Sequence, residues 1–409
     1  WELCRDDINA TWYMFDPHEV VKKYGKALED TYGDEWKEFY LKLVEDKNIS
    51  RRTMPVKEMV RLLIKSWTET GTPFVFNRDA VNKFNPNKHK GMIYSSNLCT
   101  EIAQNMSASE TISTEIVDEN GDTIIVNKTK PGDFVECNLA SLTLGKFDVT
   151  DQAVLEETVR TIVRALDNVI DLNYYPTPYA EVTNKKYRAI GLGTSGYHHM
   201  LVKNDIKWTN REAHAEFVDK VYEDINYYAI LESMEIAKEK GAYREFEGSD
   251  WQTGDYFALR DYNSERWEEL KEKVAENGLR NGYLMAIAPT GSTSIISGTS
   301  AGVDPIMSRY FLEEKKGAIV PRVAPGLTTK TFWLYENAHD IDQNISMEMA
   351  GVRQRHIDQA QSINIYITNE YTMRQILNVY IKAWESGVKS IYYVRGKSLE
   401  VEDCDSCAS

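Results

Sequence analysis

The sequence predicts an α/β protein in which helices alternate with short strands. Apolar side chains recur at three- and four-residue steps over residues 150–176 and 211–240, the spacing of helices with one buried face. The later run 283–288 is short and apolar, which indicates a buried strand. No internal repeat and no low-complexity linker divides the 409 residues. Helices and strands that alternate in this way favour an α/β architecture.

The first 70 or so residues are predicted to be helical. Apolar side chains recur at mostly three- and four-residue steps over residues 18–44, as on a helix that buries one stripe. A second helix is expected at about 56–67, because the helix-breaking cluster Gly71-Thr72-Pro73 follows it.

Residues 74–144 change to a pattern of short strands and loops. Within them, Asn120-Gly121 lies between two apolar segments rich in β-branched residues, 114–117 and 123–126. Asn-Gly is the preferred pair for a two-residue hairpin turn, so these segments are predicted to pair.

The remaining elements follow in order towards the C-terminus. Thr150 is the expected cap of its helix, and Gly241 is the expected end of the helix that precedes it. A late helix at about 373–386 is followed by a strand at 389–394. From Lys397 the residues are acidic and small, without apolar periodicity, so the tail is predicted to be mobile.

Charge and composition exclude several classes of protein. Acidic residues outnumber basic ones by 63 to 48, a formal net charge of −15, which disfavours general binding to nucleic acid or to anionic membranes. No run approaches the roughly 18 apolar residues of a membrane span, and the first residues lack the pattern of a signal peptide. A cytoplasmic location is therefore expected. The chain begins without Met, so it is interpreted as a processed protein or a piece of a longer one.

The sharpest chemical cluster is Asn97-Leu98-Cys99-Thr100-Glu101. In an extended or finger-like loop, residues two apart face the same side, so an amide, a thiol and a carboxylate would converge. A neighbouring carboxylate raises the pKa of a thiol, which suits hydrogen-atom chemistry better than thiolate attack. The structural alternative is a buried strand cysteine beside a solvent-facing glutamate.

The other cysteines differ in their surroundings. Cys137 lies in an expected strand and by itself is interpreted as a packing residue. Cys404 and Cys407 form a C-x-x-C pair in the polar tail, either a dithiol exchange site or half of a zinc site. Because no second C-x-x-C exists and the seven histidines are scattered, dithiol exchange is favoured and no metal site is predicted.

Two glycine-containing segments resemble phosphate-binding loops. The first follows the expected strand 283–288 and offers backbone amides and hydroxyls without a Walker lysine; its residues are Pro289, Thr290, Gly291, Ser292, Thr293 and Ser294. An ordinary Gly/Ser loop is the alternative. The second, 191–196, matches the dinucleotide fingerprint G-x-G-x-x-G, but no buried strand precedes it, so nicotinamide or flavin binding is disfavoured.

Tyr392 and Tyr393 are adjacent in the last expected strand. In a regular strand their rings would point to opposite faces, as ordinary sheet-surface aromatics do. If they form a redox pair, the backbone must bend to bring the rings together.

Taken together, these motifs resemble the large, catalytic subunit of class I ribonucleotide reductase. The segment 96–102 is similar to the finger loop of that family, and the other motifs follow in the family's order, from about Thr11 to the C-terminus. Two minor patterns, 71–74 and 357–362, agree with it. The tyrosine pair favours class I over the cobalamin-dependent class, and Arg395-Gly396 lacks the surroundings of a glycyl-radical site.

The resemblance implies a fold and a division of the chain. The expected fold is the second half of a ten-stranded α/β barrel with a central finger loop, preceded by a helical segment. Residues 1–75 would lead into the barrel, 76–395 would form the finger loop and the C-terminal half-barrel, and 396–409 would form a flexible redox tail.

The resemblance also implies roles for individual residues. Cys99 would become the thiyl radical that abstracts the ribose 3′ hydrogen, with Glu101 as the base for the 3′-hydroxyl and Asn97 as a hydrogen-bond partner. Cys137 would be one of two reducing thiols, and the segment 289–294 would hold the substrate diphosphate. Tyr392 and Tyr393 would relay the radical. Cys404 and Cys407 would reduce the active-site disulfide.

Cofactors and partners follow from the same resemblance. No cofactor is expected on this chain, because the radical would come from the metal centre of a separate small subunit. The expected partners are that small subunit, the N-terminal portion of the large subunit, thioredoxin or glutaredoxin, and a ribonucleoside diphosphate, in an oligomer of large and small subunits. The thiol partner of Cys137 would lie in the missing portion, since Cys4 has the wrong sequence context.

Three functional hypotheses remain open from the sequence. The leading one is a split or truncated large subunit that is inactive alone and exposes an apolar surface where the missing half docks. The second is a non-catalytic assembly module that keeps the motifs. The third is a dinucleotide-binding oxidoreductase built on residues 191–196.

Overall fold

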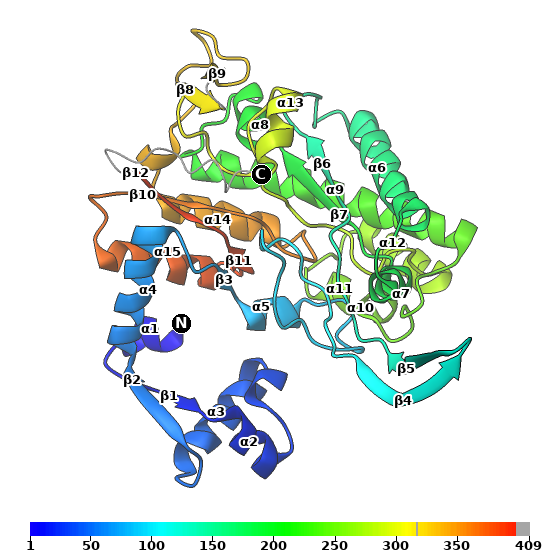
Figure 1. Ribbon diagram of the computed structural model, residues 1–409. Coiled ribbons are helices and arrows are strands. Elements are labelled where there is room, and N and C mark those ends of the chain that lie inside the picture. Colours follow the sequence, from blue (N-terminus) through cyan, green and yellow to red (C-terminus); the bar gives the residue numbers. More distant parts are fainter. Residues whose placement is uncertain (316–317, 398–409) are drawn as a thin grey trace.

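The computed structural model describes residues 1–315 and 318–397, and it confirms the predicted α/β class (Figure 1). Its helices are α1 (Glu2–Asp6), α2 (Pro17–Tyr24), α3 (Gly33–Glu45), α4 (Val56–Thr70), α5 (Arg78–Lys83), α6 (Gln152–Leu172), α7 (Pro178–Tyr187), α8 (Tyr197–Lys203), α9 (Arg211–Lys240), α10 (Asp250–Thr253), α11 (Asp255–Ala258), α12 (Glu265–Asn277), α13 (Gly291–Ser297), α14 (Gln343–Gln354) and α15 (Met373–Glu385), with 3-10 turns η1 (Leu28–Asp30) and η2 (Ala338–Asp340). Its strands are β1 (Thr11–Phe15), β2 (Arg51–Pro55), β3 (Val75–Phe76), β4 (Glu110–Glu119), β5 (Asp122–Lys130), β6 (Leu139–Thr143), β7 (Gly191–Ser195), β8 (Tyr310–Lys315), β9 (Ala318–Val323), β10 (Ile365–Thr368), β11 (Ser390–Ile391) and β12 (Val394–Lys397).

A row of parallel segments forms the framework of the protein. β6 pairs in parallel with β7, and a parallel bridge from Leu192 to Met285 adds the apolar run 283–287. A second parallel bridge, from Ile287 to Gln361, leads to the segment that continues into β10, which pairs in parallel with β12. Parallel strands need helical crossovers between them, and α6, α9, α14 and α15 provide these.

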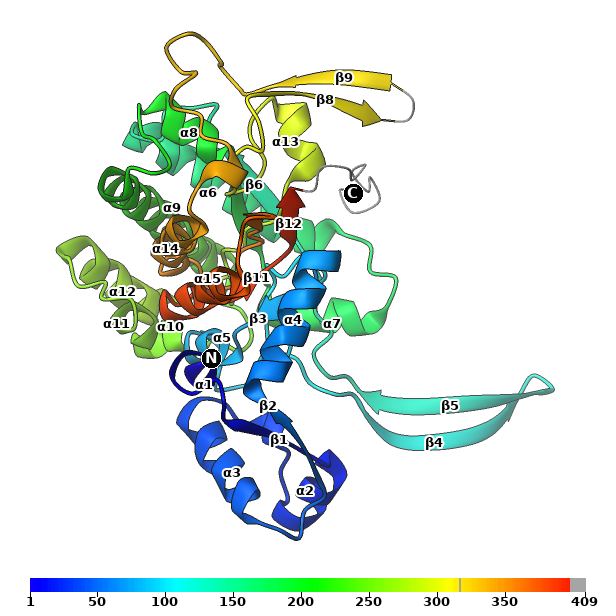
Figure 2. The same ribbon diagram turned by 90° about the vertical axis from the view of Figure 1, so that its left-hand side faces the viewer.

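Long helices cover one side of this row, as Figure 2 shows for α9, α14 and α15. They pack in sequence, α6 on α9, α9 on α14 and α14 on α15, and α15 contacts α4. The main apolar core lies between them and the strands; fully buried members include Leu192, Ile225, Met285, Ile287 and Ile365. No helix within the described ranges combines the length and the apolar composition that a crossing of a bilayer requires.

The N-terminal segment differs from the predicted run of helices. Its helix over 18–44 is broken, because Gly25 adopts a left-handed conformation that ends α2, and α3 starts only at Gly33. The antiparallel pair β1–β2 was not predicted at all. A small core of its own, Val20, Phe39, Leu43 and Ile49, fills this lobe.

Several local predictions are confirmed. β4 and β5 form the expected hairpin, with both turn residues, Asn120 and Gly121, at positive φ as a type I′ turn requires. Helix α9 ends at Gly241 as expected. The predicted cap Thr150 is wrong by one residue: Asp151 accepts bonds from the amides of Ala153 and Val154, while the Thr150 hydroxyl donates to Asp148.

Gly191 and Gly193 belong to strand β7 rather than to a phosphate-binding turn, and Gly196 follows the strand as the N-terminal cap of α8. A Cβ on Gly193 would lie 2.4 Å from the carbonyl oxygen of Ala286, and one on Gly191 would lie 2.4 Å from Leu139. Close strand packing therefore explains Gly191 and Gly193, and the dinucleotide interpretation loses its basis because they lie within the strand.

Gly193→Ala is expected to destabilise the fold by about 1–3 kcal/mol or more, because the added methyl group meets rigid backbone. Urea unfolding of the variant followed by circular dichroism measures this. Gly91→Ala is the matched control, since its Cβ would meet Asn105 at an ordinary 3.8 Å. An unchanged midpoint for Gly193→Ala would contradict the packing argument.

Candidate active site

The loop that carries Cys99 is a tight turn, not an extended finger strand. The amide of Thr100 donates to the carbonyl of Asn97, and Thr100 has a positive φ of 69°. The Asn97 side chain closes the turn by accepting from the amide of Ile102, 3.1 Å away. The expected convergence of amide, thiol and carboxylate is thus achieved by a turn rather than by strand alternation.

Five side chains from three separate parts of the chain form what we call the thiol cluster: Asn97, Cys99, Glu101, Cys137 and Tyr392. The Asn97 amide donates to the sulfur of Cys137 at 3.5 Å. The Tyr392 hydroxyl donates to the sulfur of Cys99 at 3.7 Å. Glu101 is almost fully buried, and its carboxylate lies 3.1 Å from the hydroxyl of Ser362.

Both thiols of the cluster are held protonated. Burial raises the pKa of Cys99; the hydrogen bond from Tyr392 lowers it by less than burial raises it, and the negative charge of Glu101 adds a smaller increase. Desolvation by the surrounding chain, with a further contribution from Glu101, raises the pKa of Cys137 to about 11. Burial also raises the pKa of Glu101, which hydrogen bonds from Asn97 and Ser362 partly offset. Near neutral pH the thiols are therefore hydrogen donors rather than thiolates.

The structure corrects the expectation that Cys137 lies packed in a strand. It precedes β6 instead of lying within a strand, and its side chain is exposed rather than packed in the core. A buried packing role is therefore wrong for Cys137. Its neighbours are the polar groups of the thiol cluster.

The tyrosine pair lies where the last strand is interrupted. β11 ends at Ile391 and β12 starts at Val394, so Tyr392 and Tyr393 fall in the irregular backbone between them. Their ring centroids are 4.3 Å apart. The bend that brings two adjacent rings together is therefore present, with the rings tilted by 57° to each other, and Tyr392 reaches Cys99.

The segment 289–294 is the start of helix α13, not a free loop. Thr290 has a left-handed conformation, and its hydroxyl accepts from the amide of Gly302 at 2.7 Å. Gly291, Ser292 and Thr293 are exposed, whereas Ser294 is buried and bonds back to Gly291. The exposed amides and hydroxyls of the first turn remain available to a ligand.

The remaining thiols lie apart from this cluster or outside the described residues. Cys4 is on α1 and packs against the main core. Cys404 and Cys407, the predicted exchange pair, lie outside the described residues. Among residues 1–315 and 318–397, no group of three or more His, Cys, Asp or Glu side chains is arranged to hold a metal ion.

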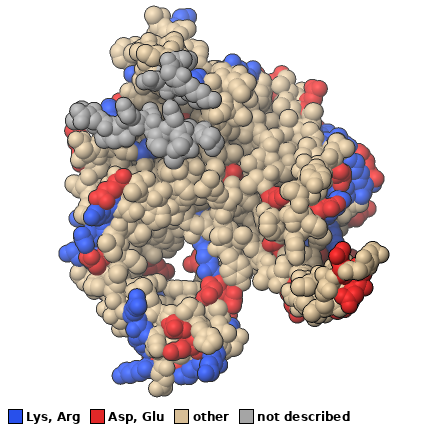
Figure 3. Space-filling model, viewed as in Figure 1, with Lys and Arg blue, Asp and Glu red and all other residues tan. Residues whose placement is uncertain are grey.

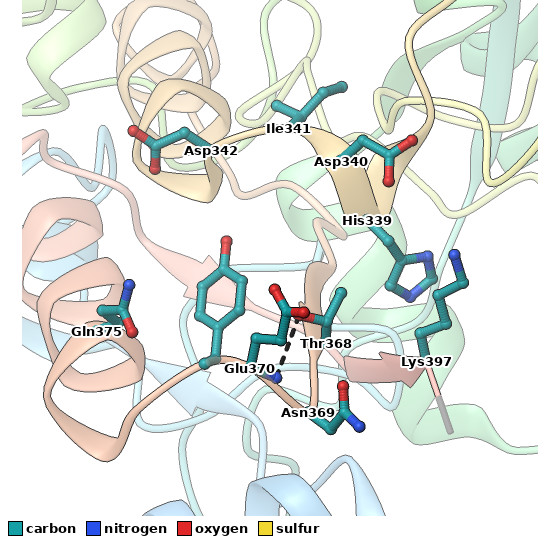
Figure 4. A pocket seen from close by; sticks show the side chains of 10 residues that line it. His339, Asp340, Ile341, Asp342, Thr368, Asn369, Glu370, Gln375 and Lys397 are labelled. Carbon is teal, nitrogen blue, oxygen red and sulfur yellow. Dashed lines mark hydrogen bonds between the residues drawn. The ribbon is translucent and has the colours of Figure 1, made fainter. Parts of the chain in front are cut away.

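A surface pocket lies elsewhere, at the carboxyl ends of β10 and β12 (Figure 4). Acidic side chains and one lysine line much of it, including Asp340, Asp342, Glu370 and Lys397. None of the predicted site residues lies in it, so it is separate from the thiol cluster.

Three residues that touch the thiol cluster or the tyrosine pair were not predicted as site residues. Phe74 packs on both tyrosine rings, with centroids 4.6 and 4.8 Å away. Ser362 contacts Cys99 and Glu101, and Asn364 contacts the backbone of Tyr393. Phe74 and Ser362 lie within the two minor family patterns, which is the one signal that could have found them.

Comparison with known proteins assigns the chain to a family. The sequence matches the family described as "Ribonucleotide reductase, barrel domain" over residues 1–394. It is 58% identical to the ribonucleoside-diphosphate reductase subunit alpha of Treponema pallidum (strain Nichols), over 100% of this chain and 48% of that protein. Identity to the subunits of the same name from Helicobacter pylori (strain J99) and Bacillus subtilis (strain 168) is 36% and 31%, over 97% and 99% of this chain and 55% and 58% of theirs. The chain spans about half the length of these curated relatives.

Proposed function

Because the chain belongs to the ribonucleotide reductase barrel-domain family, we propose that it is the C-terminal part of a class I ribonucleoside-diphosphate reductase large subunit. In this role it reduces ribonucleotides to deoxyribonucleotides by thiyl-radical chemistry, in the cytoplasm. The observation that carries the proposal is the contact of the Tyr392 hydroxyl with the Cys99 sulfur, 3.7 Å apart, beside a second thiol and a buried carboxylate.

Cys99 is the residue that starts the reaction. A tyrosyl radical at Tyr392 takes the hydrogen atom of the Cys99 thiol, and the thiyl radical then takes the 3′ hydrogen of the ribose. The raised pKa of Cys99 supports this, because only the protonated thiol carries the hydrogen atom that must be transferred. Glu101 takes the proton of the 3′-hydroxyl, and Asn97 binds the substrate hydroxyls.

Cys137 supplies reducing equivalents. Cys137 and a thiol from the N-terminal portion form a disulfide and give up two electrons and two protons. These reduce the 2′ carbon of the ribose, and the 2′-hydroxyl leaves as water. Cys404 and Cys407 restore the thiols by exchange and are re-reduced by thioredoxin or glutaredoxin. The raised pKa of Cys137 is compatible with a hydrogen donor at the 2′ carbon.

The substrate diphosphate binds at the first turn of α13. Gly291, Ser292 and Thr293 are exposed there, while the Thr290 hydroxyl accepts from the amide of Gly302 and the Ser294 hydroxyl donates to the carbonyl of Gly291. Amides and hydroxyls of this kind bind phosphate without a lysine.

The radical enters from a separate small subunit that carries the metal centre, through Tyr393 and then Tyr392. The contact of the two tilted rings, with centroids 4.3 Å apart, and the packing of Phe74 on both support a short relay that ends at Cys99.

The site needs further protein to close it. Leu98, at the tip of the thiol loop, is 75% exposed, and Ile296 on α13 is 86% exposed. Charged side chains gather towards the edges of the face in Figure 3, and its middle carries few. A radical site must exclude water, so these apolar side chains are proposed to contact the N-terminal portion of the large subunit.

The experiment is a reconstitution of cytidine diphosphate reduction from this chain, the small subunit and dithiothreitol, with and without a polypeptide that supplies the N-terminal portion. Activity is expected only in the complete mixture. Robust turnover without the N-terminal portion would contradict the need for a second thiol partner. No turnover in any mixture, with all chains folded and associated, would favour the non-catalytic assembly module instead.

A further inference from the structure

A β-bulge places Tyr392 and Tyr393. The amide of Tyr392 donates to the carbonyl of Ile363 at 2.8 Å, and the amide of Ile365 donates to the carbonyl of Tyr393 at 2.9 Å. Two residues of the last strand therefore stand opposite one residue, Asn364, which is the arrangement of a bulge. The bulge turns both rings to neighbouring positions and leaves the amide of Tyr393 outside the ladder.

The side chain of Asn364 accepts the hydrogen bond of that amide, with Oδ1 3.2 Å from the nitrogen of Tyr393. Its orientation is set by Asp304, because the Asn364 Nδ2 donates to one oxygen of Asp304 at 2.6 Å and its backbone amide donates to the other at 3.2 Å. With the amide group held in this way, its oxygen faces Tyr393. A buried amide left unpaired would cost about 1–3 kcal/mol, so this bond stabilises the bulge.

The thiol loop is attached to the same segment two residues earlier. The amide of Ser362 donates to the carbonyl of Ile287, and the Ser362 hydroxyl donates to the carbonyl of Cys99 and lies 3.1 Å from the carboxylate of Glu101. The amide of Ala360 donates to the carbonyl of Glu101 at 2.9 Å. Both sides of the contact between Tyr392 and Cys99 are therefore fixed to residues 360–364.

We infer that Ser362 and Asn364 are positioning residues, which together hold the Tyr392 hydroxyl against the Cys99 sulfur. In this role neither acts on the Cys99 sulfur or the Tyr392 hydroxyl directly; they act through the loop and the bulge. The inference rests on the proposed function for its catalytic meaning, but the geometry that it explains can be tested on the thiol itself.

The test is the pH dependence of Cys99 alkylation by iodoacetamide, measured on the folded chain by mass spectrometry of the Cys99 peptide. Three titratable groups act on this thiol: the Tyr392 hydroxyl, the Glu101 carboxylate and the Cys137 thiol. Tyr392→Phe removes the hydrogen bond to the Cys99 sulfur, so its alkylation rate shows the full effect of losing that bond. Asn364→Ala is expected to reproduce it, with a two- to tenfold slower alkylation near pH 8, on the order of one hydrogen bond.

Two further variants separate positioning from general damage. The paired exchange Asn364→Asp with Asp304→Asn keeps an acceptor for Tyr393 and the bonds between the two side chains, so it is expected to restore the wild-type profile. Ser390→Ala is the matched control, because the Ser390 hydroxyl is buried and donates to the carbonyl of Gln361 on the same segment, 2.9 Å away. It is expected to lose stability without a change in Cys99 reactivity.

A wild-type Cys99 profile in folded Asn364→Ala, or an exchange variant that remains slow, would overturn the inference. In the reconstituted enzyme, Ser362→Ala and Asn364→Ala are expected to lower kcat with little change in KM. Because alkylation needs neither substrate nor small subunit, a failed reconstitution would count against the proposed function and leave the positioning result to stand or fall separately.

Discussion

Cys99→Ser is expected to abolish cytidine diphosphate reduction in the complete mixture, by about three orders of magnitude or more, or roughly 4 kcal/mol in activation free energy. The oxygen–hydrogen bond of serine is too strong to give up a hydrogen atom to a phenoxyl radical, so no radical forms next to the substrate. The chain should fold normally, because serine fits in the half-buried site of Cys99. Formation of deoxycytidine diphosphate, quantified by chromatography, measures the effect.

Cys4→Ser is the matched control for this change. Cys4 is also half-buried, and burial raises the pKa of its thiol, but it lies on α1 and packs against the main core. Its replacement is expected to leave most of the activity. If folded Cys99→Ser retained more than about a tenth of the wild-type rate, thiyl chemistry at this residue would be refuted.

The members of the thiol cluster were predictable from the sequence, but the way in which they meet was not. Asn97, Cys99 and Glu101 lie within one short segment, so any compact loop brings them together. That the loop is a turn depends on Thr100 at positive φ, for which threonine has no preference. Taken alone, Cys137 was interpreted as a packing residue because free cysteines usually are; the family resemblance implied a reducing thiol, and the fold shows it exposed beside Asn97.

Long-range contacts explain most of what the sequence did not reveal. Ser362 is 263 residues from Cys99, and Tyr392 is 293 residues from it. Nothing in local spacing indicates which serine or asparagine of the second half reaches the loop. The bulge at Tyr392 follows from hydrogen bonds to residues 363–365, and a strand pattern alone predicts the two rings on opposite faces.

Elements with strong local signals were placed well. Helix α9 and the hairpin β4–β5 are set by apolar spacing and by the turn pair Asn120-Gly121. Apolar and polar side chains alternate only weakly along β1 and β2. In the antiparallel pair, Arg51 and Arg52 stand opposite Phe15 and Met14, so the sequence shows no clear two-residue period there. Helix α13 is short and rich in Ser, Thr and Gly, and the residue before it, Thr290, accepts a bond from the distant amide of Gly302, which no local pattern indicates.

Tyr392→Phe is expected to suppress turnover as strongly as Cys99→Ser, although it removes one oxygen atom and leaves the ring in place. Phenylalanine keeps the packing on Phe74 and on Tyr393, so the fold and the bulge should persist. It has no hydroxyl hydrogen to exchange with the Cys99 thiol, so the relay would stop one step before the substrate. The measurements are deoxycytidine diphosphate formation and, for the fold, the thermal midpoint.

Tyr380→Phe controls for the loss of a buried tyrosine hydroxyl. Tyr380 lies on α15 and stacks on Trp67, with ring centroids 3.8 Å apart, so its replacement tests packing without touching the relay. We expect near-wild-type turnover from it. Equal and small losses for the two variants would mean that the contact between Tyr392 and Cys99 does not carry the radical, and the hydrogen atom would have to reach Cys99 by a route that avoids Tyr392. A large loss for Tyr392→Phe alone ties catalysis to the single contact that the bulge creates.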